Sequence, residues 1–283
     1  MRYTSIVSTA IMLLCCNACK QPEESKSVAY GSNASAGRYY NIRGIKMYCE
    51  VYGEGEPLLI IHGNGGSIAN FSNNIPYFSK KYKVIIADSR AQGKSTDHSD
   101  SLSYEMMADD YAALLTALKV DSANVIGWSD GGINGVLLAI RHPEKVKKLA
   151  VTGTNLQPDT NAVFQEVWDI VGPDYQKLKR KVNKSEEEKK NWKLLKLLTE
   201  QPHIPVSDLG KIACPTLVIG GDHDVIREEH TMLIYHSIPK SYLWILPNSG
   251  HSTPVVYKDV FNTTVDDFFN KPYRVIKGAD RFN

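Results

Sequence analysis

The chain of 283 residues is long enough for one large domain or two small ones, and α/β folds often occupy such a length as a single unit. Its residues are 42% hydrophobic, 23% charged and 9% aromatic, which is typical of a folded globular protein and excludes a disordered, collagen-like or coiled-coil chain. The formal net charge of +2 is too small to attract a nucleic-acid backbone, so we expect no nucleic-acid partner.

The N-terminus has the pattern of an export signal. Arg2 is followed by an apolar run of 11 residues from Ile6 to Cys16, whereas a bilayer span needs about 20. We therefore predict a signal peptide over residues 1–18. Ala18 before Cys19 resembles the cleavage and lipidation site of bacterial lipoproteins, which implies an acylated Cys19 and a place in the periplasm or outer membrane. Lipidation of Cys16 and simple secretion as a soluble protein are the alternatives.

The next segment, residues 19–37, is rich in small and polar side chains. Such a composition cannot bury enough apolar surface to become ordered, so we interpret it as a tether that holds the domain to the membrane through the lipid alone. Cys49 and Cys214 are interpreted as isolated core thiols, because each belongs to a strand-like region. The cysteine spacing does not match a metal site, and we expect neither a metal nor an organic cofactor.

The pattern of apolar residues predicts a largely parallel α/β sheet with an antiparallel start. Residues 45–52 alternate between apolar and polar side chains, and residues 38–42 would pair with them as a hairpin. Short apolar runs follow that are typical of strands covered on both faces: 58–61, 84–87, 125–126, 149–151, 217–219 and 243–246. Between them, residues 104–118 and 133–140 repeat apolar side chains at helical spacing.

Residues 156–205 interrupt this alternation. Apolar residues near Trp168 and Trp192 predict two amphipathic helices, separated by the charged run 177–190. We interpret the segment as a helical lid over the carboxyl edge of the sheet, inserted into a core formed by residues 38–155 and 206–283. Open α/β sheets bind their ligands at this edge. Two ordinary crossover helices with a long solvated connection are the alternative.

The sequence Gly127-Trp128-Ser129-Asp130-Gly131 lies between a predicted strand and a predicted helix. This is the context in which G-x-S-x-G forms a tight turn that presents the Ser hydroxyl as a nucleophile. Asp224 and His251 follow the last two predicted strands, so all three side chains belong to loops at one sheet edge. A His can take the Ser proton and return it to a leaving group, and a buried carboxylate orients the imidazole. Asp222 is the alternative acid.

A Gly-rich loop at His62-Gly63-Asn64-Gly65-Gly66 follows the strand at 58–61. Its backbone can direct an N–H toward a developing oxyanion, and we expect the oxyanion hole to consist of the N–H groups of Asn64 and Asp130. His62 itself is interpreted as a structural loop residue.

From about residue 38 to 270 the sequence resembles the α/β-hydrolase family. Residues 88–95 are similar to that family's D-x-R-G-x-G-x-S loop, with Ala91 where Gly is usual, and the family pattern favours Asp224 as the acid. The stretch GWSDGGI resembles the biphenyl hydrolase-like (valacyclovirase-like) amino-acid ester hydrolases. That resemblance implies that Asp130 holds a substrate ammonium, with Trp128 as a second substrate contact. A carboxylate that only stabilises the start of a helix is the alternative for Asp130.

These observations predict a serine hydrolase that cleaves a carboxylic ester, or a similar acyl bond of a small molecule, through an acyl-enzyme on Ser129. A C–C bond hydrolase and an aminoacyl peptidase are the alternatives among enzymes, and a non-catalytic ligand-binding protein is the alternative of another class. The sequence does not determine the oligomeric state.

Overall fold

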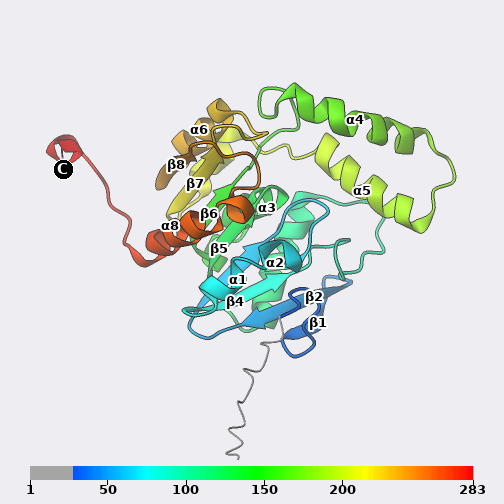
Figure 1. The fold of residues 1–283 in the computed structure, drawn as a ribbon, viewed down its shortest axis with the longest axis horizontal. Coiled ribbons are helices and arrows are strands. Elements are labelled where there is room, and N and C mark those ends of the chain that lie inside the picture. The colour runs from blue at the N-terminus through cyan, green and yellow to red at the C-terminus, as the bar shows by residue number, and fades with distance from the viewer. Residues whose placement is uncertain (1–27, 283) are drawn as a thin grey trace, which may run out of the picture.

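A computed structural model describes residues 28–282, which form an eight-stranded sheet with helices on both faces (Figure 1). The predicted signal peptide, Cys16, Cys19 and the first part of the tether lie outside the described residues. The strand order is β1-β2-β4-β3-β5-β6-β7-β8. The strands are β1 (Gly37–Ile42), β2 (Ile45–Tyr52), β3 (Glu56–Ile61), β4 (Tyr82–Ala87), β5 (Ala123–Trp128), β6 (Val146–Thr152), β7 (Thr216–Gly221) and β8 (Ser241–Leu246).

The pairing confirms a mostly parallel sheet with an antiparallel start. β1 pairs with β2, and β2 with β4, in antiparallel fashion, whereas β3 to β8 pair in parallel. Each predicted apolar run lies within an observed strand. The strands extend beyond the runs by up to three residues, because backbone pairing continues where side chains are no longer fully apolar.

Helices cover the two faces of the sheet, and alternate strand residues face each layer. Leu59 and Ile61 pack in the core that includes α2, α3 and α6, while Leu58 and Ile60 pack in the core that includes α1 and α8. Side chains buried on both faces explain the continuous apolar runs. These helices and the short α7 have the following bounds: α1 (Ile75–Phe78), α2 (Tyr104–Ala117), α3 (Asp130–Arg141), α6 (Glu228–Ser237), α7 (Thr253–Val256) and α8 (Lys258–Asn270).

Two further helices, α4 (Gln165–Arg180) and α5 (Glu186–Glu200), make up most of the segment predicted as a lid, which is called the lid below, and they extend beyond the body of the domain (Figure 1). The charged run 177–190 was predicted to separate them, but the helices include most of it and only residues 181–185 connect them. Lys, Arg and Glu are good helix formers, and the Ser185 side chain caps α5 by accepting the N–H of Glu188. A run of charged residues is therefore no reliable sign of a loop, because most of this run is helical.

The last residues of the predicted tether pack against the domain, which corrects the tether prediction for that part. The Glu50 carboxylate accepts the backbone N–H groups of Gly31 at 2.8 Å and Asn33 at 2.9 Å, and the hydroxyls of Tyr48 and Tyr52 at 2.9 and 2.8 Å. Glu50 and Tyr48 are therefore buried, although the alternation of β2 places them on its polar face. Four donors satisfy the buried carboxylate of Glu50, and two of them, the N–H groups of Gly31 and Asn33, hold a segment in place that composition alone predicts to be disordered.

None of the helices in residues 28–282 combines the length and the apolar character that a membrane span requires.

Candidate active site

The turn between β5 and α3 places Ser129 at the carboxyl edge of the sheet. Ser129 has φ 58° and ψ −123°, a strained backbone that costs about 1–3 kcal/mol and persists only where its surroundings enforce it. The flanking glycines permit this turn: a Cβ on Gly127 would lie 2.2 Å from the carbonyl oxygen of Gly131, and one on Gly131 2.1 Å from that of Ile61. The strain directs the Ser hydroxyl out of the turn, as in a nucleophile elbow.

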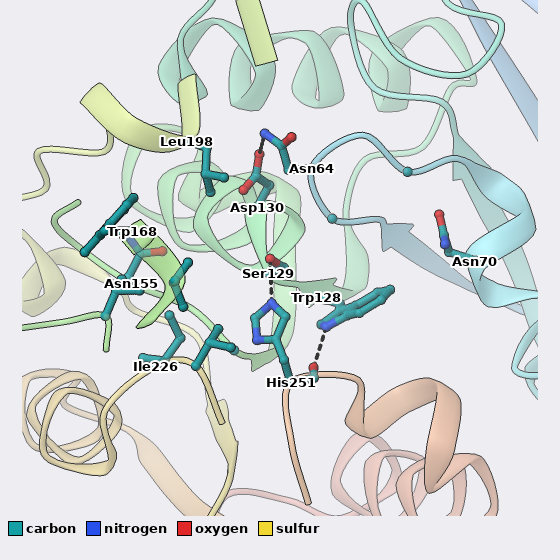
Figure 2. A pocket seen from close by; sticks show the side chains of 16 residues that line it. Asn64, Asn70, Trp128, Ser129, Asp130, Asn155, Trp168, Leu198, Ile226 and His251 are labelled. Atoms are coloured by element: carbon teal, nitrogen blue, oxygen red, sulfur yellow. Dashed lines mark hydrogen bonds between the residues drawn. The ribbon is translucent and has the colours of Figure 1, made fainter. Parts of the chain in front are cut away.

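The structure brings Ser129, His251 and Asp224 into one hydrogen-bonded chain, of which Figure 2 shows the bond between Ser129 and His251. His251 Nε2 lies 2.9 Å from Ser129 Oγ, and His251 Nδ1 lies 2.6 Å from Asp224 Oδ1. Because an ionised carboxylate only accepts, Nδ1 has the proton and Nε2 accepts the Ser hydroxyl. The Asp224 side chain is 1% exposed and also accepts the N–H of Ile226 at 3.2 Å, so its position is fixed.

Asp222, the alternative acid, has other partners. Its Oδ1 accepts the Ser249 N–H at 3.0 Å and lies 2.9 Å from His223 Nδ1. The hydrogen bond with His223 lowers the pKa of Asp222 to about 2, with further hydrogen bonds from the backbone of residues 248 and 249. Asp222 thus stabilises the loop that precedes His251 rather than contacting the imidazole.

Two residues at the ends of β5 and β6 position His251, one by a hydrogen bond to its backbone and the other by leaving space for its ring. The indole Nε1 of Trp128 donates to the His251 carbonyl at 2.8 Å. Gly153 lies at the end of β6 with φ 63°, and a Cβ there would be 2.7 Å from His251 Cε1 and 2.8 Å from His251 Nδ1. Sequence analysis missed Gly153. The signal available was a Gly directly after a strand that ends at the same edge as Ser129.

The loop after β3 contains the structural histidine and Asn64. His62 is fully buried, donates from Nδ1 to the Gly63 carbonyl at 2.8 Å and accepts the Ser89 N–H at Nε2 at 2.9 Å. Burial lowers the pKa of His62, so it remains neutral and has a structural position. Asn64 Nδ2 donates to Asp130 Oδ2 at 2.8 Å and to the Leu194 carbonyl of α5 at 3.3 Å.

Asp130 is 2% exposed, yet it lines the same cavity as Ser129 (Figure 2). Desolvation raises the pKa of Asp130 to about 6, and the hydrogen bond from Asn64 opposes this rise. A carboxyl with this pKa is mostly ionised at neutral pH. The fully buried hydroxyl of Tyr104 also interacts with this carboxylate and, like Asn64, opposes the rise of its pKa.

A cavity of about 300 Å³ opens above the nucleophile. Its polar lining includes Asn64, Asn70 and Asn155. No Lys or Arg is among the described residues that line it, and Asp130 is its only carboxylate. The side formed by the lid and by the loop after Asp224 is apolar: Val163, Val167, Trp168, Leu198, Val225 and Ile226. Trp128 also lines the cavity, so both predicted substrate contacts, Trp128 and Asp130, lie where a ligand could reach them.

The start of the lid pairs with the loop that contains the acid. Val163 forms an antiparallel bridge with Ile226, the Phe164 N–H donates to the Val225 carbonyl at 3.0 Å, and the Arg227 N–H donates to that of Ala162 at 2.9 Å. The start of the lid, residues 162–164, is therefore fixed next to Asp224, and Val163 in this segment is part of the apolar wall of the cavity.

Residues 28–282 contain no cluster of three or more His, Cys, Asp or Glu side chains that could hold a metal. Cys49 and Cys214 are buried free thiols, as interpreted from the sequence.

Comparison with known proteins agrees with this geometry. Residues 56–191 match the family model described as alpha/beta hydrolase fold. The chain is 23% identical over 269 residues to the serine hydrolase BPHL of Homo sapiens, covering 87% of this chain and 90% of that protein. It is 24% identical over 249 residues to the pimeloyl-[acyl-carrier protein] methyl ester esterase of Legionella pneumophila, covering 79% and 99%. The solved enol-lactonase from Burkholderia xenovorans superposes with a TM-score of 0.71 at 20% identity, covering 83% and 100%.

The fold is therefore the α/β-hydrolase fold, and the relatives found for it are hydrolases and esterases.

Proposed function

We propose that the protein is a serine hydrolase that cleaves a carboxylic ester through an acyl-enzyme on Ser129. The observation that supports this most strongly is the hydrogen-bonded chain from Ser129 through His251 to Asp224 at the base of a cavity. In the proposed reaction Ser129 Oγ attacks the ester carbonyl while His251 Nε2 takes its proton. The imidazolium then returns that proton to the departing alkoxide, and Asp224 stabilises the imidazolium. A water molecule, activated by His251, releases the acid and regenerates Ser129.

In this proposal the backbone N–H groups of Asn64 and Asp130 stabilise the oxyanion of the tetrahedral intermediate. Asp130 is the first residue of α3, where N–H groups have no partner within the helix. Asn64 belongs to the loop after β3, and its side chain is joined to Asp130 at 2.8 Å. Two donors held in place before the reaction need no reorganisation when charge develops, and each such donor is worth about 10²–10³-fold in kcat.

The charges of the cavity favour a small ester whose acyl group is neutral or positively charged. An anionic group buried here would meet the Asp130 carboxylate without a Lys or Arg among the described lining residues. The apolar wall that includes Trp168, Leu198 and Ile226 fits an aliphatic or aromatic group instead. This composition favours ester hydrolysis over cleavage of a carboxylated diketone by a C–C hydrolase.

A second candidate, hydrolysis of α-amino-acid esters or aminoacyl peptides, is favoured by the Asp130 carboxylate, which lines the cavity beside Ser129. A substrate ammonium there would form a charge-assisted hydrogen bond, worth about 1.5–3 kcal/mol, or roughly ten- to a hundredfold in kcat/KM. Asp130→Asn keeps the backbone donor and removes the charge. We expect this variant to lose much more activity on amino-acid esters than on acetyl or butyryl esters, whereas equal losses would limit Asp130 to the support of Asn64 and of the helix start.

The experiment is a hydrolysis screen of p-nitrophenyl acyl esters beside amino-acid esters, with Ser129→Ala as the blank. Turnover by the wild type and none above background by the blank is the expected result. Equal rates above background in both proteins would refute a reaction at Ser129, and no turnover of any ester by the wild type would favour a non-catalytic binding protein.

We further propose that the enzyme is exported and held at a membrane through lipid on Cys19. The support is the sequence of the signal and the Cys, together with the ordered segment at Gly31 and Asn33, which joins the N-terminal region to the domain.

A further inference from the structure

A second cavity lies under the lid, next to the catalytic one. It has a volume of about 440 Å³ and is lined by residues of α4, α5 and the loop after β3. Three leucines, Leu178, Leu194 and Leu195, give it an apolar floor. The remaining side chains of the lining are polar or charged, and three of them are exposed, so the outer end of the cavity is polar and open to solvent: Asp174, Lys177, Glu188 and Asn191. Its composition fits an aliphatic chain whose end reaches water.

Asn64 lies where the two cavities meet. Asn64 is the only described residue that lines both of them. It is held in place from two sides, because Nδ2 donates to Asp130 Oδ2 at 2.8 Å (Figure 2) and to the Leu194 carbonyl at 3.3 Å. A half-buried amide with two acceptors is fixed more firmly than a side chain held by packing alone.

The two cavities also follow one face of α5. Leu198 lines the catalytic cavity, and Leu194, one helical turn earlier, lines the second. A chain that passed Asn64 would therefore continue along the same helix, from Leu198 to Leu194, on a surface to which both leucines contribute.

We infer that Asn64 sets the upper length of the acyl group, by closing the passage from the catalytic cavity to the second cavity between α4 and α5. This inference rests on the proposed function, since it assigns the acyl specificity of the same site. Asn64 has two separate tasks: its backbone N–H faces the oxyanion, and its side chain ends the acyl pocket. A smaller side chain at this position joins the cavities and preserves the backbone donor.

The test compares kcat/KM for p-nitrophenyl esters from acetate to decanoate in the wild type and in Asn64→Ala. Each methylene that leaves water contributes about a three- to fourfold gain, so two of them give roughly tenfold. We expect the ratio of octanoate to butyrate activity to rise at least about tenfold in Asn64→Ala. A ratio is used because removal of the amide also removes the hydrogen bond from Asn64 to Asp130 and lowers all rates together.

Two control variants separate the effect of side-chain volume at position 64 from the effect of losing the Asn64 hydrogen bonds. Asn64→Leu removes the amide but keeps the bulk, and it should retain the wild-type length profile. Leu195→Trp fills the second cavity: alone it should leave butyrate hydrolysis unchanged, and combined with Asn64→Ala it should abolish the gain on octanoate.

An unchanged ratio in Asn64→Ala, with Ser129 still labelled by a fluorophosphonate, would overturn this inference while the proposed function stands. An equal rise of the octanoate to butyrate ratio in Asn64→Leu would also overturn it. So would a preference of Asn64→Ala for longer alcohols in a series of alkyl acetates, in which the acyl group stays the same. Absence of labelling in the wild type would instead refute the function.

Discussion

Gly153 provides a sharp test of how the imidazole is positioned, because a single methyl group there would meet His251. In Gly153→Ala the new Cβ would lie 2.7 Å from His251 Cε1, whereas ordinary contacts begin at 3.4 Å, so the ring must move by roughly 0.7 Å. A displacement of about 1 Å at a reacting group costs on the order of 10²-fold in rate. We therefore expect kcat to fall about 10²-fold.

The same substitution also acts on the backbone. Gly153 has φ 63°, where a residue with a Cβ loses about 1–2 kcal/mol. Gly44→Ala is the matched control: Gly44 has φ 84°, and a Cβ there meets nothing within 4 Å. We expect both variants to lose a similar free energy of unfolding from backbone strain, measured by urea denaturation, and only Gly153→Ala to lose kcat on p-nitrophenyl acetate. Wild-type kcat in Gly153→Ala would refute the assigned position of His251.

Three further predictions concern the acid, the buried carboxyl and the N-terminus. Asp224→Asn should lower kcat by on the order of 10⁴-fold and Asp222→Asn by less than about tenfold, and the reverse order in steady-state assays would move the acid to Asp222. Burial raises the pKa of Asp130 from 3.8 to about 6, so the folded state binds more protons than the unfolded state in this window and stability falls as pH rises from about 4 to about 6. Asp130→Asn should remove this fall, which is on the order of 2–3 kcal/mol, and an equal slope in urea denaturation of both proteins would contradict a buried, titrating Asp130. Labelled palmitate should enter the wild type and not Cys19→Ser, whereas lipid that persists on Cys16 would relocate the site and absence from the wild type would leave a soluble exported enzyme.

The order of elements could be predicted from the sequence because strands buried on both faces contain continuous apolar runs, and the ends of β3, β5, β7 and β8 place the motif residues at one edge. The structure differs from the prediction where contacts between polar groups determine it. The four donors around Glu50 fix the segment at Gly31 and Asn33, and these contacts join residues far apart in the chain, which local composition does not show.

Contacts around the candidate site could not be predicted either, because they too join residues far apart in the chain. The sequence indicated Ser129 and His251 from motif and order, but the bond between the Asn64 side chain and Asp130 depends on how two loops approach each other. Ala91 shows a related effect: it has φ 62°, a left-handed conformation that explains why Gly is usual at this position of the resembled loop. Hydrophobic periodicity contains no information on either feature.

The central claim, that Ser129 is an activated nucleophile, is tested most directly by reaction with a fluorophosphonate and location of the adduct by mass spectrometry. His251 Nε2 lies 2.9 Å from Ser129 Oγ, so we predict one adduct, on the peptide that contains Ser129. Labelling should disappear in Ser129→Ala and slow strongly in His251→Ala, while both variants keep the wild-type circular dichroism spectrum. A folded wild-type protein that takes up no label, or takes it up equally after Ser129→Ala, would contradict the account.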